Sequence, residues 1–283
     1  GITVNSRRYY SKQVMIIRSR EEESQHDKLV KQAQRLYDQI EKKLMKSKPE
    51  VRTAFSLKEI IKTLEQWNNI SNIKTNEILR GDELFSLLCR PTLLLISYSK
   101  LKEKGERSPG VDGLSLSSIT IGTLMRLSRE LKDLSYKPRP SKRIYITKGK
   151  GLRPIGIPST RDKIVQNAIL ILIKPLFEET FFPESYGYRE GRSCHDCLSD
   201  IKYKWKNVSY FIEFDFVSAF DSIPHNRIIS GMKRRIRERS FIRIMYRIMK
   251  AGYINLHKPT DRNLNQHIGV PQGSILSSIM ANI

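Results

Sequence analysis

Hydrophobic residues recur along most of the chain with the spacing of amphipathic helices. The apolar positions of residues 24–46 lie three or four residues apart: Leu29, Ala33, Leu36, Ile40 and Leu44. A second helix is predicted to begin at Ser56, because Ser56 and Glu59 have the spacing of a capping box. Further helices are predicted at residues 82–89, 93–101, 118–134, 160–177 and 194–205, and the chain beyond Pro224 is predicted to be helical to about Lys250.

Two short stretches have the composition of strands. Residues 143–147 and 153–157 are joined by Lys-Gly-Lys-Gly, which predicts a β-hairpin. From Lys137 to Arg153 there are seven Lys or Arg and no acid. Basic groups at the mouth of a hairpin can clamp a triphosphate, because they neutralise charge that grows during phosphoryl transfer. The alternative is a solvated basic loop that touches RNA without specificity, and both interpretations can hold.

The stretch YFIEFDFVSAFDSIP, residues 210–224, is predicted to open as a buried strand, because aromatic and β-branched residues alternate along it. Asp215 falls near the end of this strand, and Phe220 follows five residues later. A carboxylate at a strand end beside an aromatic ring suits a two-metal polymerase, where the acid holds Mg²⁺. The alternative is a polar residue that caps a core strand. Residues 252–256 and 267–270 are also predicted as strands.

The charge of the chain narrows the choice of partner. Its 51 Lys and Arg exceed its 29 Asp and Glu, which gives a formal net charge of +22 and a pI of about 10.0. Such an excess indicates a polyanionic partner, most simply RNA or DNA. A basic protein of the membrane surface is the competing class, although no apolar run reaches the length of a membrane-spanning helix.

Three segments concentrate this charge or mix it with aromatic residues. The first twenty residues carry five basic residues and no acid, which is typical of an organellar transit region or a basic RNA-binding arm. Residues 227–250 carry nine Lys or Arg against one acid, Glu238, which favours contact with a phosphate backbone. The loop FFPESYGYREGRS, residues 181–193, interleaves aromatic residues, Gly and Arg, as a loop that stacks on bases and holds phosphate does.

The cysteines do not indicate a disulfide framework, because there are only three of them. Cys194 and Cys197 form a CxxC, but a zinc site would need a second pair. We therefore interpret them as small residues that pack a helix.

Five motifs, in order, resemble the reverse transcriptase domain of group II intron proteins, also called maturases. The resemblance runs from about Asp82 to the C-terminus, and residues 1–80 match no motif of the family. The motifs are SPGVDG, GLRPIGIPSTRDKIVQNAI, ESYGYREGRSCHDCL, FDFVSAFDSI and GVPQGSILSSIMANI. Cys197 stands in the third motif where a small residue is usual.

The resemblance implies an α+β fold: the fingers and palm of a right-hand polymerase, here with a helical, basic N-terminal extension. It divides the chain into an extension (1–80), a fingers-like region (81–207) and a partial palm (208–283). It implies that Asp215 is the catalytic residue and binds Mg²⁺ with the Phe216 carbonyl close by, and that Phe220 excludes a ribose 2′-OH. The implied contacts to the incoming nucleotide are Lys148, Lys150, Arg153, Phe216, Phe220, Pro271, Gln272 and Gly273. The implied or charge-based contacts to RNA are Tyr186, Arg189, Arg192, Lys233, Arg234, Arg235 and Arg237.

One departure from the family qualifies this expectation. The second metal-binding motif of the family, Y-A-D-D or a variant, is not in the sequence, so we expect Mg²⁺ chemistry only if its aspartates are supplied elsewhere.

Three interpretations follow: an N-terminal part of a group II intron reverse transcriptase or maturase, an inactive relative that serves as an RNA-binding subunit of a ribosome or splicing complex, or a binding protein with decayed motifs. The expected partners are RNA and a second polypeptide or larger ribonucleoprotein. The expected location is the mitochondrion.

Overall fold

The computed structural model describes the backbone of residues 6–73, 77–149 and 151–283, and the side chains of these residues from Gln25 onward except that of Lys148. Contacts between residues divide the chain into two compact units, Gly1–Gln66 and Trp67–Ile283. No helix among the described residues combines the length and the apolar character needed to cross a membrane.

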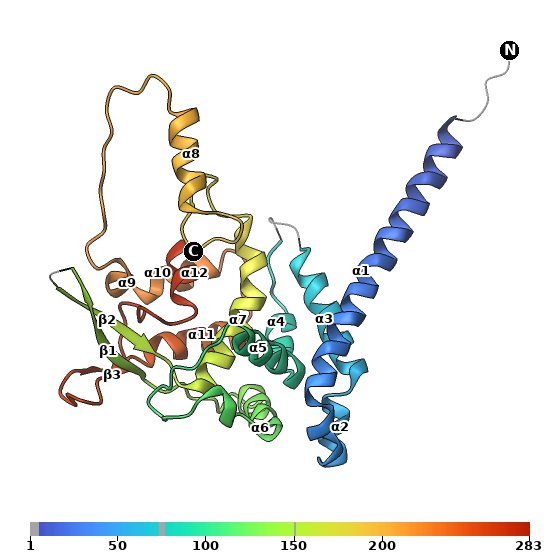
Figure 1. Ribbon diagram of the computed structural model, residues 1–283, viewed down its shortest axis with the longest axis horizontal. Helices are drawn as coiled ribbons and strands as arrows, with labels where there is room; N and C mark the ends of the chain where they lie inside the picture. Colours follow the sequence, from blue (N-terminus) through green and yellow to red (C-terminus); the bar gives the residue numbers. More distant parts are fainter. Residues whose placement is uncertain (1–5, 74–76, 150) are drawn as a thin grey trace. The chain divides into compact units, whose positions relative to one another are not determined.

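The first unit is helical (Figure 1). It contains α1 (Ser6–Met45), α2 (Pro49–Ala54) and the start of α3 (Leu57–Ser71). The predicted stripe on α1 is confirmed at four positions, because Ala33, Leu36, Ile40 and Leu44 are buried. The predicted cap is also present, since the Ser56 hydroxyl accepts the Glu59 N–H at 3.4 Å.

The core of the second unit is built on α7 (Thr160–Glu178). Helices α4 (Glu83–Leu88) and α5 (Pro91–Glu103) pack against α7, and α6 (Ile121–Lys132) packs against α4 and α5. These helices confirm the predicted positions. Helix α7 is buried on more than one face, and its polar residues are paired accordingly. The Asn167 amide donates to the Ser97 carbonyl at 3.1 Å, and the Ser97 hydroxyl donates to the Ile164 carbonyl at 2.7 Å. These bonds tie α5 to α7 inside the core, where an unpaired polar group would be costly.

The predicted hairpin is confirmed as β1 (Ser141–Lys148) and β2 (Gly151–Ile157), which pair antiparallel with Ile146 opposite Arg153. Two short strands extend the sheet, β3 (Tyr253–Ile254) and β4 (Arg262–Asn263), in the order β2-β1-β3-β4. Gly252 makes this junction possible. Its φ is +68°, and a Cβ there would lie 1.9 Å from the Asn263 carbonyl oxygen, so only glycine fits.

The remaining helices are α8 (Cys194–Lys204), α9 (Ala219–Ser222), α10 (His225–Met232), α11 (Arg239–Lys250) and α12 (Ser277–Asn282), with a 3₁₀ turn at Leu116–Ser118. The region after Pro224 is therefore two helices separated by a turn, rather than one continuous helical run. Of residues 267–270, predicted as a strand, only Ile268 forms a β-bridge, with Pro224.

The predicted strand at residues 210–216 is wrong. This stretch has no regular secondary structure, and its side chains face solvent: Phe214 is 77% exposed and Phe216 is 72% exposed. In Figure 1 the connection between α8 and α9 runs away from the rest of the second unit. A strand needs a hydrogen-bonded neighbour, and no described strand lies beside this segment, so the alternating pattern alone does not produce one.

Candidate functional site

Two motifs far apart in the sequence meet at the base of the hairpin. The Arg153 guanidinium donates from Nε to Oε1 of Gln272 at 2.8 Å, across 119 residues of sequence. The Gly156 N–H also donates to the Gln272 carbonyl, at 2.5 Å. The close approach depends on glycine, because a Cβ on Gly156 would lie 2.7 Å from the Pro271 Cβ and one on Gly273 would lie 2.8 Å from the Gly156 carbonyl oxygen. The structure thus brings together Arg153, Pro271, Gln272 and Gly273.

Phe220 lies next to this junction. The Val270 N–H donates to the Phe220 carbonyl at 2.7 Å, so the aromatic residue is fixed beside the segment that leads into Pro271. Gly269 has φ +83°, and a Cβ there would meet the Asp221 carbonyl oxygen at 2.7 Å. The Phe220 ring makes an edge-on contact with Tyr188, with ring centroids 6.1 Å apart. Phe220 therefore joins the hairpin junction to the loop of residues 181–193.

Asp215 and Phe216 do not join this cluster as the sequence predicted. Both lie in the exposed stretch before α9. Ser218, the residue directly before α9, has a left-handed backbone conformation with φ 52°. No group of three or more His, Cys, Asp or Glu side chains gathers around a metal-sized space among the described residues. Mg²⁺ takes an octahedron of oxygens built from several carboxylates and waters. The described residues do not fit such an ion by themselves, and Asp215 is a single exposed carboxylate.

Arg189 holds the loop of residues 181–193 from within. Its guanidinium donates to the Glu178 carboxylate at 2.8 Å, and to the carbonyls of Phe182 at 2.8 Å and Ser185 at 3.0 Å. Its side chain is only 8% exposed. Arg189 therefore stabilises the loop, a role that the motif resemblance did not distinguish from an RNA contact.

Two other predicted RNA contacts lie in the same loop and are partly exposed. Arg192 donates to the Pro183 carbonyl at 2.8 Å and lies over the Tyr186 ring, 5.5 Å from its centroid. The Tyr186 hydroxyl donates to the Asp200 carboxylate, which raises the pKa of Tyr186 to about 12. The loop thus presents an arginine stacked on an aromatic ring, an arrangement that a base or phosphate can share.

The other predicted contacts divide by exposure. Lys233, Arg234 and Arg237 are exposed between α10 and α11. Arg235 is 5% exposed and donates toward the Ile73 carbonyl at 3.5 Å, so little of this side chain is accessible and its contact with RNA stays a prediction. The predicted contacts at Lys148 and Lys150 lie outside the described side chains, as do the basic residues of the first twenty positions.

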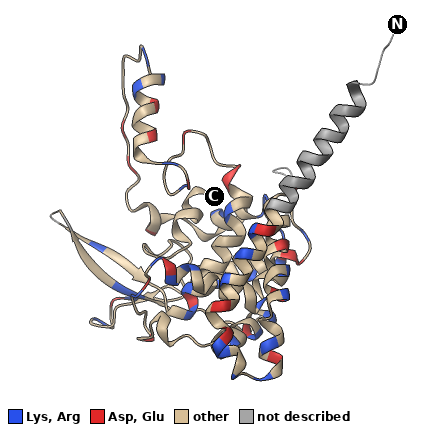
Figure 2. Ribbon diagram, turned by 45° about the vertical axis from the view of Figure 1, so that its right-hand side comes forward, with Lys and Arg blue, Asp and Glu red and all other residues tan. Residues whose placement is uncertain are grey.

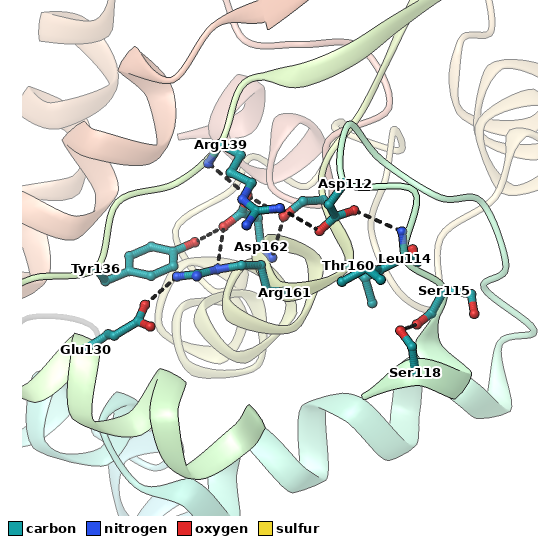
Figure 3. Close-up of polar contacts among 11 residues, drawn as sticks. Asp112, Leu114, Ser115, Ser118, Glu130, Tyr136, Arg139, Thr160, Arg161 and Asp162 are labelled. Carbon is teal, nitrogen blue, oxygen red and sulfur yellow. Dashed lines mark hydrogen bonds and ion pairs between the residues drawn. The ribbon is translucent and has the colours of Figure 1, made fainter. Parts of the chain in front are cut away.

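A buried polar cluster around Asp162, which was not predicted, fixes the region from which the hairpin starts (Figure 3). The Asp162 carboxylate accepts the Tyr136 hydroxyl at 2.6 Å, the Ser159 hydroxyl at 2.6 Å and the Arg139 N–H at 2.9 Å. Burial raises the pKa of Asp162 above its usual value, although these hydrogen bonds act in the opposite direction. A signal was present, because Ser159 and Asp162 stand three residues apart at the start of a helix, as in a cap.

The same cluster holds the SPGVDG loop. The Arg139 guanidinium lies 3.3 Å from the Asp112 carboxylate, and the Thr160 hydroxyl donates to the Leu114 carbonyl at 2.5 Å. At the start of the loop, buried Lys163 donates to the Glu106 carboxylate at 2.8 Å and to the Ser108 carbonyl at 2.5 Å. The N-terminal turn of α7 thus anchors this early motif beside the hairpin.

The three cysteines all lie in the described part of the chain, and none forms a disulfide. Cys89 is buried, and burial raises the pKa of its thiol to about 12. Cys194 and Cys197 lie on α8, with no metal-binding group around them among the described residues.

Comparison with known proteins agrees with the motifs. Residues 146–283 match the family described as reverse transcriptase (RNA-dependent DNA polymerase). The chain is 32% identical over 230 residues to the putative COX1/OXI3 intron 2 protein of Saccharomyces cerevisiae, which covers 80% of this chain and 26% of that protein. It is 31% identical over 233 residues to the group II intron-encoded protein LtrA of Lactococcus lactis, which covers 80% of this chain and 37% of that protein.

A shorter match gives 27% identity over 82 residues with nuclear intron maturase 2, mitochondrial, of Arabidopsis thaliana, and it covers 29% of this chain and 11% of that protein. The chain thus spans only about a quarter to somewhat over a third of the length of the first two relatives. The motifs, the order in which they occur and the relatives agree. Residues 146–283 match the reverse transcriptase family, and the chain is similar to group II intron-encoded proteins.

Proposed function

We propose that this chain is part of a group II intron-type RNA-directed DNA polymerase and maturase that binds intron RNA. With a palm strand supplied from elsewhere, it extends DNA by Mg²⁺-dependent nucleotidyl transfer. The observation that carries this proposal is the 2.8 Å hydrogen bond between Arg153 and Gln272. Phe220 lies beside this pair, because its carbonyl accepts the N–H of Val270, which precedes Gln272 by two residues. This arrangement places a cation, an amide and an aromatic ring at one junction, which suits a nucleotide with its phosphates, its base edge and its sugar.

Each side chain then has a distinct role. Arg153 binds the triphosphate of the incoming nucleotide, because a guanidinium offers a planar set of donors to phosphate oxygens. Gln272 holds the Arg153 side chain in place and contacts the nucleotide or template. Phe220 lies against the sugar and excludes a 2′-OH. Asp215 would be a ligand of Mg²⁺, which would neutralise the charge of the phosphates, and its other carboxylate ligands would be supplied from elsewhere.

Primer extension tests the proposal directly. The protein, isolated from its native source with its bound partners, is given an RNA template, a DNA primer and Mg²⁺, and Asp215→Ala is the matched variant. We expect extension that is lost in Asp215→Ala while RNA affinity stays nearly unchanged. Extension that persists in Asp215→Ala would assign the activity to another protein.

A second candidate is a catalytically inactive relative that serves as an RNA-binding subunit of a larger ribonucleoprotein, such as a ribosome or splicing complex. The position of Asp215 favours it, because this carboxylate lies in an exposed stretch without regular secondary structure. Tight RNA binding without extension in the same assay would support this candidate and reject the polymerase.

The partners and location follow from the same proposal. The basic surface has RNA as its partner, and the exposed stretch at residues 210–217 is covered by a second polypeptide or a larger ribonucleoprotein. We propose a mitochondrial location, because one relative is named as mitochondrial, although another is bacterial.

A further inference from the structure

A cavity of about 760 Å³ lies between α10, α11 and the segment at residues 267–268. Neither Arg153 nor Gln272 lines it. Four Lys or Arg side chains line it, and no acid does: Lys233, Arg237, Arg239 and Arg243. Its lining also includes Tyr246 and three isoleucines. We call this space the α10–α11 cavity.

The sequence of α11 explains one wall. Its apolar face, which includes Phe241, Met245 and Met249, is buried in the core. The opposite face therefore presents Arg239, Arg243 and Tyr246, which are spaced four and three residues apart and are all exposed. One cationic and aromatic stripe thus runs along the helix where it borders the cavity.

The turn between the helices explains the charge of the other wall. Arg237 is held by its backbone N–H, which donates to the Leu79 carbonyl at 2.7 Å, and by its Nε, which donates to the Lys233 carbonyl at 3.2 Å. Glu238, the one acid of residues 225–250, turns the other way. It is 1% exposed, and its carboxylate accepts the Leu84 and Phe85 N–H groups at 3.0 and 2.8 Å. The fold thereby removes the nearest acid from the rim of the cavity.

The rest of the lining suits an aromatic ligand. Ile229, Ile242 and Ile268 give the cavity apolar surface. The Tyr246 hydroxyl lies 3.5 Å from Nδ1 of His267, which ties the ring to the segment opposite α11. An apolar surface beside a fixed tyrosine favours a planar group, whereas the surrounding cations favour phosphate.

Unpaired RNA combines these properties. Its backbone carries regularly spaced phosphates, and its bases are free to stack on an aromatic side chain. A base-paired stem offers the phosphates but keeps its bases stacked inside. Figure 2 shows Lys and Arg on several elements of the chain, so charge alone does not distinguish this place from others. The pairing of charge with an apolar, tyrosine-lined cavity does.

We propose that the α10–α11 cavity binds a single-stranded segment of RNA, with a base against Tyr246 and the flanking phosphates on Arg239, Arg243, Lys233 and Arg237. This inference rests on the proposed RNA binding and deepens it, because it assigns a defined site and an unpaired ligand. It adds Arg239, Arg243 and Tyr246 to the residues that contact RNA.

The test measures the affinity of the protein for a fluorescently labelled single-stranded RNA of mixed sequence, by anisotropy over a series of salt concentrations. Arg239→Gln with Arg243→Gln should weaken binding about tenfold and reduce the salt slope by roughly 0.7 for each phosphate that is no longer neutralised. The matched control is Arg129→Gln with Lys132→Gln, which removes two exposed charges from α6. A loss of affinity no larger than in this control would overturn the inference.

Tyr246 separates base stacking from charge. Tyr246→Ala should weaken binding about tenfold with an unchanged salt slope, because no charge is removed. Tyr246→Phe should retain most of the affinity, since the ring remains, and its thermal unfolding should match that of the unaltered protein. A blunt RNA duplex of equal length should be little affected by Tyr246→Ala. An equal loss with the duplex, or no loss with either RNA, would overturn the assignment.

The experiment also separates this inference from the proposed function. If the unaltered protein binds RNA and the cavity variants bind as well as the control, the cavity assignment fails while the proposed RNA binding stands. If the unaltered protein binds no RNA, the proposed function fails and the cavity assignment fails with it. A cavity that takes up a protein partner instead would give the first of these results.

Discussion

The Tyr136 hydroxyl lies 2.6 Å from Oδ1 of Asp162, and both side chains are buried. A raised folded-state pKa means that Asp162 holds its proton more tightly when the protein is folded. Its contribution to stability is therefore full below the ordinary pKa of 3.8 and declines as the pH rises through the folded-state value. The tyrosine opposes this decline, because its hydroxyl favours the ionised carboxylate.

Tyr136→Phe should lower the free energy of unfolding by about 1–3 kcal/mol, since a buried carboxylate loses a donor. The decrease should be larger at pH 7.5 than at pH 4, because the donor favours the charged form. Urea unfolding at the two pH values measures this difference. Tyr203→Phe, at an exposed position on α8, is the control and should change neither value. An equal decrease at both pH values would contradict the assigned role of the hydroxyl.

Glu238 provides a second pH-dependent element. Burial raises the pKa of its carboxyl above 4.5, so its contribution to stability declines as the pH rises through the folded-state value. Glu238→Gln should flatten the dependence of stability on pH above about 4.5, while one of the two N–H groups of α4 keeps an acceptor. Thermal unfolding across pH 4–8 measures this dependence of stability on pH. Glu184→Gln, at an exposed position in the loop of residues 181–193, should leave the profile unchanged.

Arg153 and Gln272 should be energetically coupled. Arg153→Gln and Gln272→Ala should each destabilise the protein, and the double variant should be destabilised by about 1 kcal/mol less than the sum of the two, because one hydrogen bond is shared. Denaturant unfolding of all four proteins gives the coupling. Additive effects would mean that the bond contributes nothing to the fold, and the pair would then have to be explained by ligand binding alone.

Arg189 should be more sensitive to replacement than its neighbour. Arg189→Lys leaves one ammonium where a fork of donors served four acceptor oxygens, so the amides of residues 181–193 should exchange with solvent faster. Arg192→Lys alters a side chain that donates to the Pro183 carbonyl at the surface, and it is the graded control. Hydrogen exchange measured by mass spectrometry reports on both. Equal exchange in the two variants would show that Arg189 is not the residue that holds the loop.

The helices and the hairpin were predictable because their causes lie close together in the sequence. The stripe on α1, the cap at Ser56 and the glycines between the hairpin strands act within a few residues. The parts that failed depend on distant partners. The alternation at residues 210–216 indicates which side chains would share a face if the segment were a strand. It does not provide the neighbouring strand with which the segment would have to pair.

The same distinction applies to the site. The motif resemblance placed Arg153, Phe220 and Gln272 in one pocket, and the structure brings them to one junction. The resemblance assigned Arg189 to RNA and charge counting assigned Arg235, yet both side chains are largely buried. Backbone carbonyls accept their donors, from the same loop for Arg189 and from Ile73 for Arg235. Nothing in a local pattern marks a basic residue whose partners are carbonyls.

The exposure of residues 210–217 has a consequence for the two carboxylates in this stretch. An unpaired run of aromatic and β-branched side chains is a template on which copies of the same chain can stack as strands. Glu213 and Asp215 interrupt that run and are exposed with it. Stacked copies would align like charges, so the two acids act as gatekeepers against self-association. We therefore expect Asp215, which was predicted to hold a metal, also to limit self-association of the chain while this segment is uncovered.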